Sequence, residues 1–218
     1  MNGVVVVIGP EAVVIRSDRP MMAVSSAPVG GGLGDVRSII NLHVAKDDPC
    51  CDPPGMVAAF ADRAALPGPR VGMLTGAWTE DARQATVARY GMEVLVVATV
   101  GLGNRMAAGA LPGAVRGGAS TINVVLVVGA AAEPAALVNA VITVTEVKAR
   151  LLGELGVRDA DGRIATGTST DAVVAAATGL GPPARFAGPA SELGWLVARA
   201  AEEALGEGMR RWLAENAR

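Results

Sequence analysis

One seven-residue segment of the chain concentrates side chains that can do chemistry. Residues 165–171 read Ala-Thr-Gly-Thr-Ser-Thr-Asp, which places four hydroxyls and one carboxylate together in a chain that is 51% hydrophobic. Ser, Thr and Asp side chains bond to the nearby backbone, so such a segment is typical of a turn or of a loop that faces a ligand. Asp171 is therefore predicted either to end a turn or to face a pocket beside Thr168 and Thr170.

Small and hydroxylated residues recur where other apolar segments end. They occur in Ser25-Ser26-Ala27, Gly30-Gly31-Gly32, Gly72-Met73-Leu74-Thr75, Thr121-Ile122-Asn123 and Thr145-Glu146-Val147-Lys148. Glycine permits the close approach of a bulky ligand to the backbone, although a glycine run is equally typical of a plain turn. The pattern predicts one pocket assembled from many strand ends.

The sequence leaves the roles of two titratable residues, Glu146 and His43, open. Asn139, Thr143, Glu146 and Arg150 follow one another at intervals of four, three and four, which aligns them on one face of a predicted helix. That face is either the solvated side of an amphipathic helix or a polar face of a site. His43 is the one histidine, and its apolar predicted strand favours a local hydrogen bond over catalysis. Without a cysteine–histidine cluster, we expect no metal site with nitrogen and sulfur ligands.

The elements that must position these residues follow from apolar runs and from helix and turn signals. We expect strands at Val4–Ile8, Ala12–Arg16, Met21–Ser26, Ser38–Val44, Val71–Thr75, Glu93–Val100, Thr121–Val128, Arg163–Thr168 and Val173–Ala177. We expect helices over residues 52–66, 80–89 and 133–155 and from residue 191 to the end, with residues 101–118 as a loop. This order predicts an α+β fold with mixed or antiparallel sheets packed against helices in a single domain; a doubly wound α/β fold is the alternative.

Composition narrows the class of partner and the cellular compartment. A net charge of −2 and a pI near 5.5 provide no basic field, so we expect no nucleic-acid partner. Mean hydropathy is +0.40, yet every apolar run is short, so we expect no membrane insertion. The N-terminus lacks the basic region of a secretory signal, and the adjacent Cys50 and Cys51 rarely fit the geometry of a shared disulfide. These features predict a cytoplasmic protein.

Taken together and in order, these segments resemble the adenosylcobinamide amidohydrolase family. The resemblance covers about residues 20 to 200 and rests on Ser25-Ser26-Ala27 with Gly30-Gly31-Gly32, Asn41, Gly72-Met73-Leu74-Thr75, Ala98-Thr99, Gly103-Asn104, Ala108-Gly109, Thr121-Ile122-Asn123-Val124, Thr143-Val144-Thr145-Glu146-Val147-Lys148 and Ala165 to Asp171. Ser120 and Ser169 stand where the family more often has glycine. The resemblance strengthens the case for Glu146 and Asp171 as site residues.

The resemblance implies a single amidohydrolase domain over residues 1–218. Its reaction would hydrolyse the amide between aminopropanol and a corrin propionate side chain, giving adenosylcobyric acid in cobamide (B12) salvage. The partner would be a corrinoid small molecule. No resident cofactor is expected, because the cobalt enters as part of the substrate. The oligomeric state is left open, with a homodimer as one alternative.

For that reaction we expect Glu146 to act as general base and later proton donor, with Asp171 orienting it or sharing the task. Asn123 and Thr168 would supply hydrogen-bond donors to the oxyanion. A threonine or serine nucleophile within residues 166–170 is the alternative. The further residues predicted to bind substrate are Ser25, Ser26, Gly30, Gly31, Gly32, Asn41, Thr75, Thr99, Asn104, Thr121 and Thr170.

Two other functional classes remain open at this stage. One is a Thr-nucleophile acyltransferase or amidase that matures by internal cleavage, which the mass of the intact chain would reveal. The other is a corrinoid-binding protein without catalysis, which would release no aminopropanol.

Overall fold

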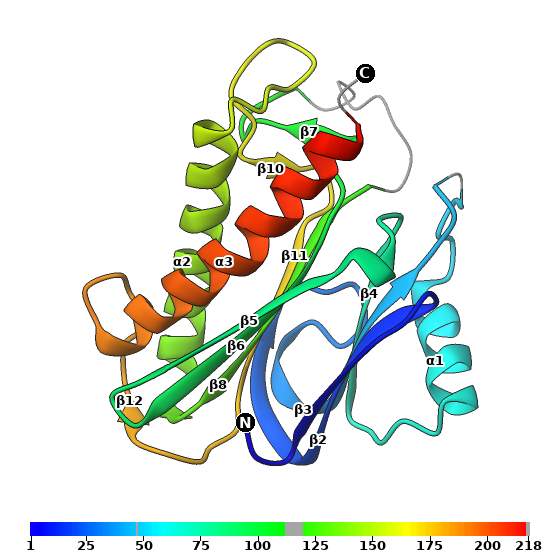
Figure 1. The fold of residues 1–218 in the computed structure, drawn as a ribbon. Helices are drawn as coiled ribbons and strands as arrows, with labels where there is room; N and C mark the ends of the chain where they lie inside the picture. Colours follow the sequence, from blue (N-terminus) through cyan, green and yellow to red (C-terminus); the bar gives the residue numbers. More distant parts are fainter. Residues whose placement is uncertain (47, 112–119, 217–218) are drawn as a thin grey trace.

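A curved eight-stranded sheet organises the molecule, with the strand order β4-β3-β2-β11-β8-β6-β5 and with β1 paired to β2 (Figure 1). The computed structural model describes residues 1–46, 48–111 and 120–216. The strands of this sheet are β1 (Val4–Ile8), β2 (Ala12–Ser25), β3 (Gly32–His43), β4 (Arg70–Thr75), β5 (Arg83–Arg89), β6 (Met92–Val100), β8 (Ile122–Gly129) and β11 (Ala172–Ala177). Two small pairs, β7 (Arg105–Met106) with β10 (Gly167–Thr168) and β9 (Ala131–Ala132) with β12 (Pro183–Ala184), complete the strands.

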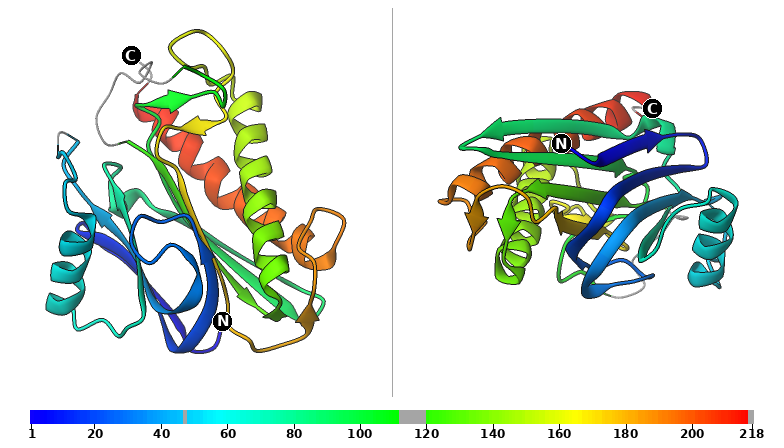
Figure 2. Two further views of the ribbon diagram at one scale, coloured as in Figure 1. Left: turned by 180° about the vertical axis from the view of Figure 1, so that it is seen from behind. Right: turned by 90° about the horizontal axis from the view of Figure 1, so that it is seen from below.

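The long strand β2 bends the sheet. Its first half pairs with β1 and its second half with β11, and its register with β3 shifts between Arg16 and Met21. The two halves of the sheet therefore lie at an angle to each other, as the view from below in Figure 2 shows. An apolar layer fills the space between them. Fully buried Ile15 and Met21 of β2 share this layer with Val127 of β8 and Val174 of β11.

Three α-helices formed by the described residues cover the outer faces of the sheet (Figure 1). The helices α2 (Pro134–Glu154) and α3 (Glu192–Glu215) lie side by side on the half that contains β5, β6 and β8. The short α1 (Pro53–Arg63), capped by the Asp52 side chain, packs Val57 and Phe60 against the other half. Each helix has an apolar side that it must bury, so the helices fix which face of each strand lies inside.

The α+β class with a mixed sheet is confirmed. The pairs β3–β4 and β8–β11 are parallel, and the remaining neighbours in the main sheet are antiparallel. The doubly wound alternative is wrong, because hairpins rather than helical crossovers join β1 to β2, β2 to β3 and β5 to β6.

The helix predicted over residues 80–89 is wrong. A single 3₁₀ turn, η1 (Thr79–Asp81), is followed by the strand β5. The Thr79 hydroxyl donates to the carbonyl oxygens of Gly9 and Pro10 at 2.7 and 3.0 Å instead of capping a helix. Residues 83–89 pair along their whole length with β6 through a turn at Tyr90 and Gly91, both at positive φ. Pairing in the sheet thus overrides the local acidic helix signal.

Three smaller predictions also change. The strands expected at 12–16 and 21–26 are one strand. Of the strand expected at 163–168, Gly167–Thr168 forms a strand and Ile164 makes an isolated bridge to Arg158. The loop predicted over 101–118 contains β7, and its residues 112–118 lie outside the described residues. Within the described part of the chain, no helix is both long and apolar enough to cross a membrane.

Candidate functional site

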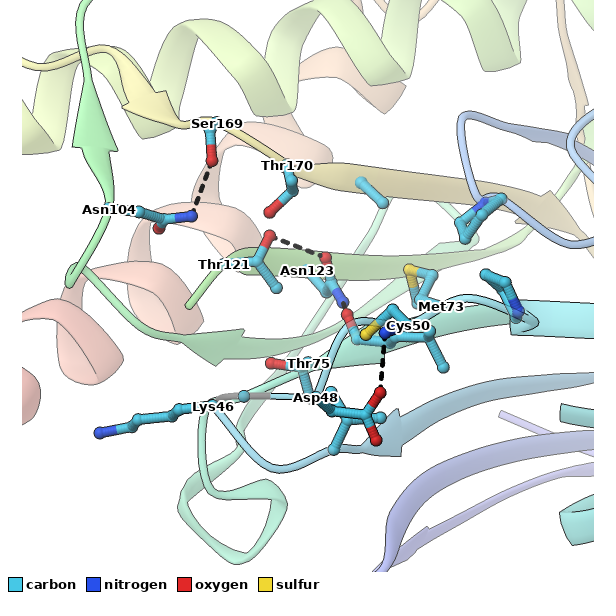
Figure 3. Close-up of a pocket in the computed structure, with 16 residues that line it drawn as sticks. Lys46, Asp48, Cys50, Met73, Thr75, Asn104, Thr121, Asn123, Ser169 and Thr170 are labelled. Atoms are coloured by element: carbon cyan, nitrogen blue, oxygen red, sulfur yellow. Dashed lines mark hydrogen bonds between the residues drawn. The ribbon is translucent and has the colours of Figure 1, made fainter. Parts of the chain in front are cut away.

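A cavity of about 480 Å³ opens where several strand ends meet (Figure 3). The ends of β4 and β8, the turn before β7 and the segment before β11 form one wall, and the segment after β3 forms another. Apolar side chains such as Met73, Leu74 and Ala172 line part of it. The neutral polar residues that line it are Thr75, Asn104, Thr121, Asn123, Ser169 and Thr170. The predicted pocket built from strand ends is therefore present.

A network of buried amides fixes the floor of this cavity. The Nδ2 group of Asn123 donates to Asn41 Oδ1 at 2.8 Å and to the Leu74 carbonyl oxygen at 2.9 Å, and Asn41 Nδ2 donates to Thr99 Oγ1 at 2.8 Å. Both hydrogens of Asn123 Nδ2 are therefore engaged, and its Oδ1 accepts from Thr121 Oγ1 at 3.4 Å. This arrangement orients Asn123 to hold the Thr121 hydroxyl, not to donate to an oxyanion.

Asn104 belongs to the wall of the same cavity and carries a buried acceptor without a partner. Its Nδ2 donates to Ser169 Oγ at 2.7 Å, and only 5% of the residue is exposed. Its Oδ1 is buried and has no hydrogen-bond partner among the described residues. Because buried polar atoms are nearly always paired, an orphan acceptor at a cavity indicates a ligand that donates to it.

Asp171 pairs with buried Lys148 instead of facing the cavity. Its carboxylate accepts from Lys148 Nζ of α2, from the Thr168 hydroxyl, and from the backbone N–H groups of Ile122 and Thr168, both at 3.1 Å. The side chains of Lys148 and Asp171 are 9% and 11% exposed. These contacts tie α2, the start of β8 and residue 168 together, so Asp171 positions the segment that carries Thr121.

The predicted site residues fall into three groups. Thr75, Asn104, Thr121, Asn123 and Thr170 line the cavity, and Asn41 and Thr99 lie behind it in the amide network. Apart from Glu146, the remaining residues serve the local fold. Thr168 binds Asp171, and the hydroxyls of Ser25 and Ser26 accept from the backbone N–H groups of Ala27 and Val173.

The glycines predicted to bind substrate form the turn between β2 and β3, outside the residues that line the cavity. Gly30 and Gly32 adopt positive φ of 66° and 96°. A Cβ on Gly31 would lie 2.5 Å from the Ala27 carbonyl oxygen. The turn itself therefore explains the need for glycine at these positions.

The structure does not bring Glu146 to the cavity. Glu146 and Arg150 are both exposed on α2, and Arg150 pairs with Glu154 and Glu202. Lys148 follows Glu146 by two residues, about 200° around the helix, and is the side chain that points inward. Of the four residues that the spacing aligns, Glu146 and Arg150 are exposed, whereas Asn139 is half-buried and Thr143 is buried.

We therefore expect Glu146→Gln to retain near wild-type turnover and stability, because a solvated carboxylate far from the cavity contributes little to either. Steady-state hydrolysis and a urea denaturation curve measure the two effects. A large loss of turnover with unchanged stability would show that Glu146 takes part in the reaction.

The sequence reasoning missed three cavity residues, Lys46, Asp48 and Cys50, which lie in the segment after β3 (Figure 3). Asp48 Oδ1 accepts from the Cys50 backbone N–H at 2.7 Å. Burial, followed by the charge of Asp48, raises the pKa of the Cys50 thiol. Since the thiolate is the reactive form, this cysteine is not activated as a nucleophile. The sequence signal that could have identified this segment is its run of charged residues directly after an apolar strand.

Comparisons with solved structures find chains of low sequence identity to this one. The solved structures similar to this chain include a β-aminopeptidase from Burkholderia sp., at 15% identity, with 93% of this chain and 78% of that chain covered and a TM-score of 0.49. A Pyrococcus horikoshii protein has 12% identity, 98% and 83% coverage and a TM-score of 0.49. The L-aminopeptidase D-Ala-esterase/amidase of Ochrobactrum anthropi has 14% identity, 95% and 83% coverage and a TM-score of 0.37.

A search of curated proteins finds no match to the sequence. The family model described as adenosylcobinamide amidohydrolase matches residues 4–217, which is nearly the whole chain. The chain therefore belongs to the adenosylcobinamide amidohydrolase family and is a hydrolase that acts on an amide C–N bond.

Proposed function

We propose that this protein hydrolyses the amide that joins 1-amino-2-propanol to a propionate side chain of adenosylcobinamide. The products are adenosylcobyric acid and the free amino alcohol, which returns a salvaged corrinoid to cobamide synthesis. Family membership supports the substrate, and the cavity at the strand ends supports the place of reaction.

The observation that carries this proposal is the cavity wall around Asn104. Pockets for small ligands measure about 300–1,000 Å³, so a cavity of about 480 Å³ fits an amide-bearing side arm with its amino alcohol. The corrin ring then lies at the mouth. The orphan Asn104 Oδ1 accepts the substrate amide N–H, and the neutral hydroxyls nearby bind a neutral arm without a charge mismatch.

We assign the attacking group to the Thr121 hydroxyl. Thr121 lines the cavity, is 3% exposed, and its hydrogen is directed to Asn123 Oδ1, so lone pairs of Oγ1 remain for attack. The Thr75 hydroxyl instead accepts from the Ala77 N–H at 3.0 Å, and Ser169 accepts from Asn104. The backbone next to Thr121 is also held in place, because the N–H of its neighbour Ile122 donates a hydrogen bond to the Asp171 carboxylate.

The proposed reaction balances in two steps. Thr121 Oγ1 bonds to the amide carbonyl carbon, the C–N bond breaks, and the hydroxyl proton ends on the departing amine nitrogen. Water then cleaves the ester, which releases the carboxylate and restores the hydroxyl. Asp48 is the carboxylate that lines the cavity among the described residues, so we assign these proton transfers to it.

The test is to incubate the full chain with adenosylcobinamide and measure released 1-amino-2-propanol by mass spectrometry. We expect one amino alcohol for each adenosylcobyric acid formed, with the Thr121→Val variant as the inactive control. Corrinoid binding without release would identify a binding protein instead. The mass of the purified chain checks the self-processing alternative, since cleavage would yield two fragments.

A further inference from the structure

A second cavity, of about 300 Å³, adjoins the first. Lys46 and Gly76 line both cavities. Gly103 and Ser120 line the second one, and their chain neighbours Asn104 and Thr121 line the first. A single ligand with two arms can therefore occupy both compartments, one arm at Thr121 and the other in the second cavity.

Two indoles line the second cavity, Trp78 and Trp212. One face of Trp78 stacks on the His43 ring, with centroids 4.8 Å apart and planes inclined by 22°, and His43 Nδ1 is 3.0 Å from the Ala77 carbonyl oxygen. Trp78 is nevertheless 60% exposed. A large aromatic side chain that is held rigidly and left uncovered at a cavity suits the stacking of a flat ring.

Charged groups of both signs line this cavity: the ammonium of Lys46 and the carboxylates of Asp81 and Glu215. Asp81 and Glu215 line it, and each pairs with Arg211, at 2.5 and 2.8 Å. A carboxylate accepts several hydrogen bonds, so these two retain acceptor sites for hydroxyl or amino donors. Gly101 and Gly103 pack against the Ser120 side chain, because a Cβ on either would lie 2.6 or 3.2 Å from its hydroxyl oxygen.

We propose that the second cavity binds a neutral purine nucleoside, namely the adenosyl group carried by the cobalt of the substrate. The adenine stacks on Trp78, and the ribose hydroxyls donate to the carboxylates of Asp81 or Glu215. This inference rests on the proposed function for the identity of the ligand. It extends that function by making this cavity the element that distinguishes adenosylated from non-adenosylated cobinamide.

The first test measures binding without catalysis. In a Trp195→Phe background, which removes the indole outside the cavity, 5′-deoxyadenosine is titrated against tryptophan fluorescence. We expect saturable quenching that Trp78→Ala abolishes. Absence of saturable quenching overturns the proposal whether or not the chain hydrolyses corrinoids.

The second test compares kcat/KM for adenosylcobinamide and dicyanocobinamide. We expect Trp78→Ala to lower the value for the adenosylated substrate by about tenfold or more and to leave the other unchanged. Trp195→Ala is the matched control and should alter neither. Equal effects of Trp78→Ala on both substrates, or no effect on either, contradict the adenosyl subsite. If neither substrate is hydrolysed, the proposed function is contradicted. The fluorescence titration then decides by itself whether the adenosyl subsite exists.

Discussion

Replacing Thr121 with valine is expected to lower kcat for adenosylcobinamide hydrolysis by about a thousandfold or more, as removal of a nucleophile does. Valine keeps the shape and β-branching of threonine at the start of β8 and removes only the hydroxyl. The buried Asn123 Oδ1 then loses its donor, which costs about 1–3 kcal/mol of folding stability. Kinetics at saturating substrate and a denaturation curve separate the two effects.

Thr121→Ser is the matched control, because it restores a hydroxyl and should recover measurable turnover. Rapid quenching of the wild-type reaction followed by mass spectrometry should show a corrinoyl ester on the peptide that contains Thr121. Near-normal turnover of Thr121→Val would show instead that water attacks the amide directly, with Asp48 as its base.

Replacing Asp171 with asparagine is expected to destabilise the fold by about 3–5 kcal/mol, because it leaves the buried Lys148 ammonium without its counter-charge. The carboxylate also accepts from the backbone N–H of Ile122, so turnover should fall as the Thr121 segment loses its anchor. Urea denaturation of the variant measures the stability change.

Asp161→Asn is the comparison for this effect. Asp161 pairs with Arg163 at the surface and is 58% exposed, so its loss should cost less than about 1 kcal/mol. The double variant Lys148→Met with Asp171→Leu should be more stable than Asp171→Asn, since it removes both charges from the interior. Equal stability of Asp171→Asn and the wild type would show that the pair does not hold α2 to the site.

The sequence by itself determined the class of fold and five of the six neutral polar residues that line the cavity. Apolar runs that end in small polar residues identified Thr75, Thr121, Asn123 and Thr170, because residues at strand ends converge wherever the strands share a sheet. Asn104 was identified by the resemblance to the family, through the pair Gly103-Asn104. These features are local, and local propensity and pattern are readable in a single chain.

Tertiary structure decided the features that depend on what an element packs against. The residue spacing of α2 placed Glu146 on a polar face, but only docking of the helix on the sheet shows that Lys148 is the inward residue and that Asp171 neutralises it. Residues 83–89 became a strand because β6 offered a partner for their backbone hydrogen bonds. Asp48 and the two tryptophans of the second cavity come from distant segments, and only the folded sheet brings those segments together.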